Sequence, residues 1–192
     1  MRPTIFFLLA AAAGLAGGIA LSQFSLANGS SFDVIAIGPW RVATKAGAVD
    51  ADPYTRASLE LSGEVPLALG EGLQFIAGVD DNGAPLTASC AYRIGPHMPA
   101  ARYWTLSVID RKGFPIENQA HRYGFRSSEI LRGADQGFEI SVSRKVRAGN
   151  WLPIGAPGGF RLALRLYDSP LSATAGGIEK SAMPHIEAER CE

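Results

Sequence analysis

Two hydrophobic patterns divide the chain. Residues 5–21 carry no polar side chain, and the only charged side chain before them is Arg2. From about residue 73 onward, apolar and polar residues instead alternate with a period of two, which is typical of half-buried strands. The pattern predicts one apolar helix at the N-terminus, followed by a mainly β domain.

The apolar run approaches the thickness of a membrane. Its seventeen residues would span about 25 Å as a helix, against a hydrocarbon core of about 30 Å. We interpret residues 1–27 as a membrane anchor, with a cleaved signal peptide as the open alternative, because Ser25-Leu26-Ala27 forms a small-x-small cleavage site. Residues 28–192 would then form one exported domain.

The charges around the run predict its orientation. Arg2 precedes it, and no basic residue follows until Arg41. The positive-inside rule therefore leaves the N-terminus in the cytoplasm and the body outside. Residues 5–21 would contact the lipid bilayer. Gly14 and Gly18 form a GxxxG spacing that permits a helix-mediated dimer, although small residues are also common in export segments.

The alternation marks the expected strands of the body. It covers residues 73–79, 86–94, 104–108, 138–142 and 160–166. In the last segment, Arg161 and Arg165 fall on the face opposite to the leucines. Turns rich in Gly and Pro separate these segments, which favours antiparallel hairpins. The predicted fold is an antiparallel β-sandwich or jelly-roll-like domain with one or two short helices.

Local signals place the helices and the tail. Asp52 as cap and Pro53 at the first position predict a helix from Pro53 to about Leu61. A second short helix or a turn is expected at Ser127-Ser128. The Gly-, Ser- and Ala-containing tail after Ser169 is expected to wrap the surface.

Charge and cysteine content narrow the partners and the compartment. The chain has 18 basic and 18 acidic side chains and no basic run, so nucleic acid is not an expected partner. Cys90 and Cys191 are the only cysteines. In an oxidising compartment such a pair predicts a disulfide that ties the C-terminus to the middle of the body; the alternative is two unpaired thiols.

Five sequence blocks together resemble the DUF1214 family of bacterial proteins. They are GPWRV (38–42), DADPYTRA (50–57), EGLQFIAGVDDNGAPL (71–86), YWTLSVIDRKGFPIENQAHRYGF (103–125) and GNWLPIGAPGGFRLALRLYDSP (149–170). The resemblance implies a β-sandwich and a frequent pairing with a DUF1254 domain, in one chain or as a neighbouring protein. It implies no agreed catalytic residues. The expected location is the bacterial inner membrane, single-pass, with a periplasmic body, or the soluble periplasm after cleavage at Ala27.

No catalytic, metal or cofactor signature stands out in the sequence. There is no GxSxG elbow, and His97, His121 and His185 lack metal-ligand spacing. Asp80-Asp81-Asn82 resembles a hairpin turn more than a calcium loop, because the EF-hand spacing is missing. We therefore expect no catalytic residue, metal or cofactor, and whether the protein is an enzyme stays open.

The candidate ligand-binding residues are His121, Arg122, Tyr123 and Trp151. The first three combine hydrogen-bond donors with an aromatic ring and suit a carboxylate or phosphate. Their alternative role is to hold a long loop, and Trp151 can equally plug the end of the core.

Two functions are weighed. The first is a membrane-anchored periplasmic domain that acts by binding an envelope protein resembling DUF1254. The alternative is a periplasmic small-molecule-binding module or enzyme with a pocket near Arg122 and Tyr123.

Overall fold

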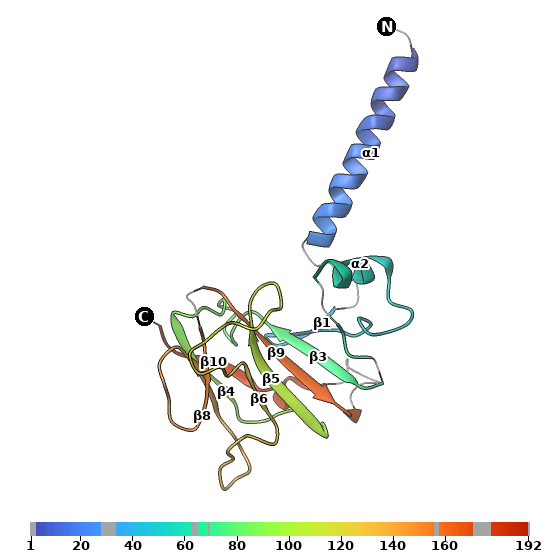
Figure 1. Cartoon of the computed structure of the whole chain (residues 1–192). Coiled ribbons are helices and arrows are strands. Elements are labelled where there is room, and N and C mark those ends of the chain that lie inside the picture. The colour runs from blue at the N-terminus through green and yellow to red at the C-terminus, as the bar shows by residue number, and fades with distance from the viewer. Residues whose placement is uncertain are drawn as a thin grey trace.

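The structure, a computed structural model, describes residues 3–27, 34–62, 65–68, 70–155, 158–170 and 178–191. A long helix, α1 (Pro3–Ala27), projects from a body built of two β-sheets (Figure 1). The body is mainly β, and its sheets remain open. This architecture confirms the expected sandwich preceded by an apolar helix.

The larger sheet has six strands and is antiparallel throughout. Its spatial order is β1-β2-β3-β9-β5-β6. The bounds are β1 (Val34–Ile37), β2 (Trp40–Ala43), β3 (Gly72–Ala77), β9 (Arg161–Tyr167), β5 (Tyr103–Ile109) and β6 (Gly124–Arg126). Three of these strands, β3, β5 and β9, lie within or close to segments that the alternation marks.

The smaller sheet has four strands in the order β10-β4-β7-β8. The bounds are β10 (His185–Cys191), β4 (Cys90–Gly95), β7 (Ile140–Ser143) and β8 (Asn150–Pro153). The pair β7–β8 is parallel, which differs from the antiparallel expectation. The chain makes this connection through only residues 144–149, without a helical crossover.

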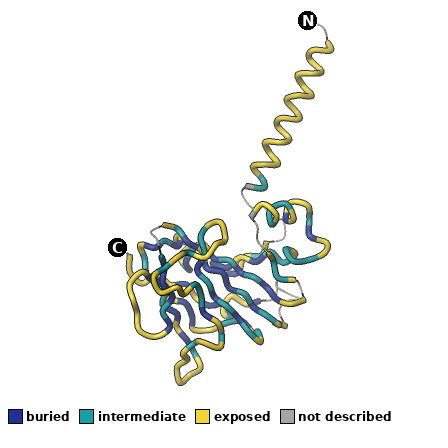
Figure 2. Tube along the Cα trace, viewed as in Figure 1, coloured by how far each residue is buried: buried dark blue, intermediate teal, exposed yellow. Residues whose placement is uncertain are grey.

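The core lies between the two sheets, as the dark band in Figure 2 shows. The fully buried side chains come from both sheets: Trp40, Phe75, Leu106, Leu162, Leu164 and Leu166 from the larger, and Ile94, Ile140, Leu152 and Ile186 from the smaller. Burying each large apolar side chain contributes about 1.5–3 kcal/mol relative to leaving it exposed. Burial alternates along β5, and it also alternates along β9 except at Ala163, which is buried as well. The inward positions predicted on both strands are therefore confirmed.

Aromatic side chains join the two layers. Trp104 of β5 packs on Phe138, next to β7, with ring centroids 5.4 Å apart. Tyr92 of β4 meets Phe160, which precedes β9, edge to face at 5.6 Å. Trp40 of β2 donates from Nε1 to the carbonyl oxygen of Pro184 at 2.8 Å. These contacts set how the sheets lie on each other, because bulky rings allow few alternative packings.

The C-terminal tail differs from the expected surface wrap. After the short 3-10 helix η3 (Lys180–Ala182), residues His185–Cys191 form β10 and pair with β4. Cys191 lies opposite Cys90 in this pairing, and the two form the predicted disulfide across 101 residues. The tail is therefore an integral strand of the smaller sheet.

Helix α1 is the segment that could cross a membrane. Residues Pro3–Leu26 are long and apolar enough for one span, and the body buries none of this window. A signal sequence has the same properties, so the helix is compatible with both interpretations. The peptide bond at which a signal peptide would be cleaved joins Ala27 to Asn28, and Asn28 lies outside the described residues. Arg2, whose charge predicts the orientation of the helix, lies outside them as well. Dimerisation through Gly14 and Gly18 stays a prediction.

Helix α2 (Pro53–Ser62) begins where the sequence predicts. Asp52 Oδ1 accepts hydrogen bonds from the backbone N–H groups of Tyr54 at 2.9 Å and Thr55 at 3.1 Å. A further hydrogen bond from the Thr55 hydroxyl is the largest cause that lowers the pKa of Asp52. Of the two outcomes expected at Ser127-Ser128, a short helix or a turn, the structure shows a turn.

Two turns share the sequence D-x-x-G-x-P and one hydrogen-bond pattern. Asp80 Oδ1 accepts the backbone N–H groups two and four residues later, both at 2.9 Å. Asp110 Oδ1 does the same at 2.8 and 2.9 Å. Gly83 and Gly113 follow with φ of 84° and 92°, which glycine adopts without steric cost. The Asp80 carboxylate is thus occupied by the turn, as expected of a turn and not of a calcium loop. The turn is closed by a single bridge between Val79 and Pro85. The strands on either side, β3 and β4, lie in different sheets, so the expected hairpin between them is not formed.

The disulfide is expected to be a main stabilising element. Replacing both Cys90 and Cys191 by Ser should lower the free energy of unfolding by about 4–5 kcal/mol, because the bridge restricts a long loop in the unfolded chain. Urea denaturation followed by tryptophan fluorescence measures the difference. A reductant should shift the wild-type transition equally and leave the double variant unchanged. An unshifted wild-type transition would show that the bridge adds little.

The two aspartate turns form a matched pair for a second test. Asp80 is buried with 4% of its surface exposed, whereas Asp110 is half-buried. Asp80→Ala should cost about 2 kcal/mol and Asp110→Ala about 1 kcal/mol or less, since unpaired backbone donors cost more when water cannot reach them. Equal losses in urea denaturation would contradict this reasoning.

Candidate functional site

The outer face of the larger sheet is the candidate functional surface. Successive side chains of a strand point to opposite faces of the sheet, so the neighbours of the core-facing leucines in β9 must point outward. Gln74 of β3, Arg165 of β9 and Thr105 of β5 lie side by side in register on this face. Arg165 Nε donates to Gln74 Oε1 at 2.6 Å. The face is therefore polar at its centre.

An open hollow of about 770 Å³ lies at the β5–β6–β9 end of this face. We call it the arginine hollow, because Arg122, Arg126 and Arg165 all line it. The three arginines come from the loop before β6, from β6 itself and from β9. Glu129 is the one carboxylate in the lining, and it pairs with Arg126 at 3.9 Å.

Asn118 holds the loop that carries the predicted residues. Its Oδ1 accepts the backbone N–H of Arg122 at 3.2 Å, and its Nδ2 donates to the Arg122 carbonyl oxygen at 2.9 Å. His121 has a left-handed φ of 50°, which helps to close the turn. The loop is thus fixed through its backbone, and the Arg122 side chain remains available to the hollow.

The side chains of Arg122 and Tyr123 have different surroundings. The Arg122 guanidinium lies over the Phe125 ring, 4.8 Å from the centroid, which is a cation–π contact. The Tyr123 hydroxyl donates to Glu117 Oε2 at 2.8 Å. This hydrogen bond, followed by desolvation and the negative charge of Glu117, raises the pKa of Tyr123 above its ordinary value of 10.0.

The structure brings together three of the four predicted ligand residues. His121, Arg122 and Tyr123 all line the arginine hollow. Trp151 instead lies on β8 of the other sheet and donates from Nε1 to the Ser143 carbonyl oxygen at 3.1 Å. It borders a separate hollow of about 380 Å³, together with Glu117 and Asn118. The loop at residues 117–121 thus borders both hollows.

Sequence reasoning did not assign Arg126 and Arg165 to the site. The alternation of apolar and polar residues in the sequence predicts that Arg165 lies on the outer face of β9, opposite the leucines. Its place in the same hollow as Arg122, more than forty residues earlier, follows only from the strand pairings β5–β9 and β5–β6. Among the residues that the structure describes, no group of three or more His, Cys, Asp and Glu could hold a metal ion.

The sequence profile of the family described as "Protein of unknown function (DUF1214)" matches residues 71–171, more than half of the chain. The chain belongs to the DUF1214 family. The match includes the whole of the blocks at 71–86, 103–125 and 149–170. The blocks at 38–42 and 50–57 lie outside it. All residues of the arginine hollow fall inside the match.

A solved structure from Vibrio parahaemolyticus shares this fold. The VPA0106 protein from Vibrio parahaemolyticus has a TM-score of 0.62 at 17% identity, over 95% of this chain and 45% of its own. A putative uncharacterized protein from Burkholderia cenocepacia gives 0.41 at 18% identity, over 77% and 46%. The chain therefore spans less than half of either protein. No curated protein matches the sequence significantly.

The Tyr123–Glu117 pair has a testable titration. Because the hydrogen bond raises the pKa of Tyr123, its stabilisation is complete below the unfolded pKa of about 10 and disappears as pH rises through the folded value. Glu117→Gln should lower the pKa of Tyr123 toward 10, as measured by phenolate absorbance, with Tyr123→Phe to assign the signal. Glu129→Gln should leave it unchanged. An unaltered titration in Glu117→Gln would contradict the assignment.

Proposed function

We propose that this DUF1214 protein is a periplasmic domain held at the bacterial inner membrane by α1. It binds a second envelope protein that resembles the DUF1254 family. The contact surface is the outer face of the larger sheet around the arginine hollow. The proposal assigns no catalytic role to any residue.

The unbalanced charge of the arginine hollow carries this proposal. Three guanidinium groups face one carboxylate there. The other sheet offers a contrast, since Arg93 on its outer face lies within 4 Å of Glu139, Glu187 and Glu189. The excess positive charge of these arginines favours association with an acidic protein surface. Each arginine can bind a carboxylate there through two hydrogen bonds.

The likeness to VPA0106 supports the partner. The matching region makes up 45% of that protein, so more than half of its chain lies outside the shared sandwich. A domain that packs against a second domain of its own chain in one protein can bind the same kind of domain as a separate protein in another. The sequence resemblance to a family often paired with DUF1254 points to the same partner class.

A small anionic ligand is the second candidate. The volume of about 770 Å³ lies within the usual range for ligand pockets, about 300–1,000 Å³. Arg122, Arg165 and the Tyr123 hydroxyl surround it with hydrogen-bonding groups that suit a carboxylate or phosphate. The hollow is open, and this favours a protein partner over an enclosed ligand.

Photo-crosslinking in native membranes tests the partner proposal. Benzoylphenylalanine at Tyr123 or Tyr167, both in the lining of the hollow, should crosslink the full chain to a DUF1254-like protein identified by mass spectrometry. Arg165→Glu should reduce this crosslink at least fivefold, because it reverses one charge of the contact. The matched control position is Glu187, whose side chain is 59% exposed on the other sheet.

The outcomes separate the two candidates. Crosslinks at Glu187 alone, or none to a DUF1254-like protein, would overturn the partner proposal. Phosphate and succinate, titrated by calorimetry, then probe the ligand alternative. Binding that Arg122→Gln abolishes and Arg102→Gln retains would support it, since Arg102 pairs with Asp168 outside the hollow.

A further inference from the structure

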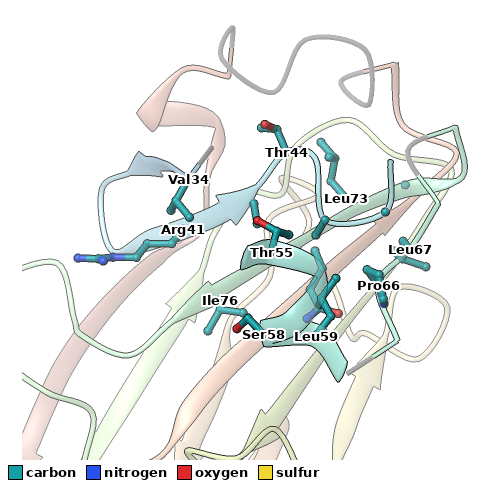
Figure 3. A pocket seen from close by; sticks show the side chains of 15 residues that line it. Val34, Arg41, Thr44, Thr55, Ser58, Leu59, Pro66, Leu67, Leu73 and Ile76 are labelled. Carbon is teal, nitrogen blue, oxygen red and sulfur yellow. The ribbon is translucent and has the colours of Figure 1, made fainter. Parts of the chain in front are cut away.

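A second hollow lies on the same sheet face, between α2 and strands β2 and β3 (Figure 3). We call this space of about 250 Å³ the helix pocket. Ser58 and Leu59 of α2 line one side, and Ile76 of β3 lines the other. It is separate from the arginine hollow, which lies at the opposite end of the sheet.

The pocket exists because α2 packs on the sheet with short side chains. A helix that covers a sheet normally fills the gap with large apolar residues. Among the α2 side chains whose burial is described, residues 53–61, only Thr55 is buried, and Ser58 and Leu59 are half-buried. The space between the helix and Ile76 is therefore left unfilled.

Close contacts hold the walls in place. The Asp52 cap fixes the start of α2. At the other side, a Cβ on Gly47 would lie 1.8 Å from the carbonyl oxygen of Leu67, so only glycine allows these two segments to approach. Arg56 Nη2 donates to the Val49 carbonyl oxygen at 2.7 Å and ties α2 to the same loop. The pocket is thus a built feature of this end of the body.

The lining mixes apolar and polar side chains and has one arginine at its rim. Val34, Leu59, Leu67 and Ile76 contribute apolar side chains. Arg41 is exposed at the rim, and Figure 3 shows its side chain running away from α2. An apolar cavity of about 150 Å³ is enough to hold benzene. The helix pocket therefore has room for part of one aliphatic chain whose acidic headgroup meets Arg41.

Exposed apolar residues are concentrated in the stretch of chain that forms the pocket. Outside α1, eight large apolar side chains are exposed among the described residues. Five of them belong to residues 34–65: Val34, Val49, Tyr54, Leu61 and Val65, with Val49 97% exposed. Such a concentration indicates a surface that meets an apolar environment.

The chain length keeps this surface near the membrane helix. Helix α1 ends at Ala27, and Val34, which lines the pocket, follows seven residues later. Even a fully extended chain spans at most about 3.6 Å per residue, so Val34 lies within about 25 Å of the end of α1. If α1 is the anchor, as proposed above, the pocket opens close to the bilayer surface.

We propose that the helix pocket binds the acyl chain of an acidic membrane lipid, with its headgroup at Arg41. The lipid comes from the bilayer that holds α1. This inference depends on the anchoring part of the proposed function, and it is independent of the partner at the arginine hollow.

The test uses the full chain in nanodiscs with two photoactivatable probes. One is phosphatidylglycerol with a diazirine near the end of one acyl chain, and the other is a free dodecanoic acid with the same group. Both should label peptides that contain residues 55–59, 66–68 or 73–76. Ser58→Leu should reduce this labelling at least fivefold by filling the pocket, whereas Ser128→Leu, at an exposed turn, should not.

Charge provides a second variant that leaves the pocket open. Arg41→Gln should weaken labelling by the two acidic probes about tenfold and leave labelling by a diazirine dodecanol unchanged, because only the acids make a charge-assisted hydrogen bond. Arg161→Gln is the matched control on an exposed arginine of the same sheet. On the wild-type protein, excess unlabelled dodecanoate should compete with the free-acid probe.

The outcomes are distinct. Labelling by the phospholipid supports the proposal. Labelling by the free acid alone retains the acyl-chain site and overturns the bilayer as its source. Labels confined to α1, or labels in the pocket that dodecanoate does not displace, overturn the site itself. The crosslinks at Tyr123 and Tyr167 are unaffected by any of these results, so failure of this inference and failure of the partner proposal can be told apart.

Discussion

Side chains along β9 point alternately to its two faces, and β9 is held between two neighbouring strands. The rest of the structure depends on this constraint. Because β9 pairs with β3 on one side and β5 on the other, each side chain can point only into the core or to the outer face. Leu162, Leu164 and Leu166 fill the core. Arg165 and Tyr167 are therefore forced outward, into the arginine hollow. The same strand therefore contributes side chains both to the core and to the candidate site.

The C-terminal strand completes the second layer. Once β10 pairs with β4, Ile186 is fully buried in the core and Pro184 accepts the hydrogen bond of Trp40. Asp81 also binds this strand, through its backbone N–H to the Ile186 carbonyl oxygen at 2.9 Å. The disulfide then joins the end of β10 to the start of β4. These contacts make the last residues of the chain part of the core.

The outer face of the larger sheet carries two hollows of different chemistry. The arginine hollow is basic and open, which suits an acidic protein surface or a small anion. The helix pocket mixes apolar and polar side chains, with Arg41 at its rim. The Gln74–Arg165 hydrogen bond connects the two sites, because Gln74 lines one and Arg165 lines the other. The proposed lipid and the proposed partner would therefore bind to the same face of the sheet.

Sequence and tertiary structure contributed differently to this picture. By itself, the sequence determined the apolar helix, the inward faces of the main strands and the start of α2 at Asp52-Pro53, because each depends on a local pattern. It also offered only one possible disulfide, Cys90–Cys191, but left two unpaired thiols as the alternative. Only the tertiary structure decided that this bond forms, that β7 and β8 run parallel, that the end of the tail forms β10, and that Arg165 and not Trp151 shares a hollow with Arg122. Those outcomes depend on which strands become neighbours, and strand neighbours are chosen by the packing of the whole core, for which no short stretch of sequence carries a signal.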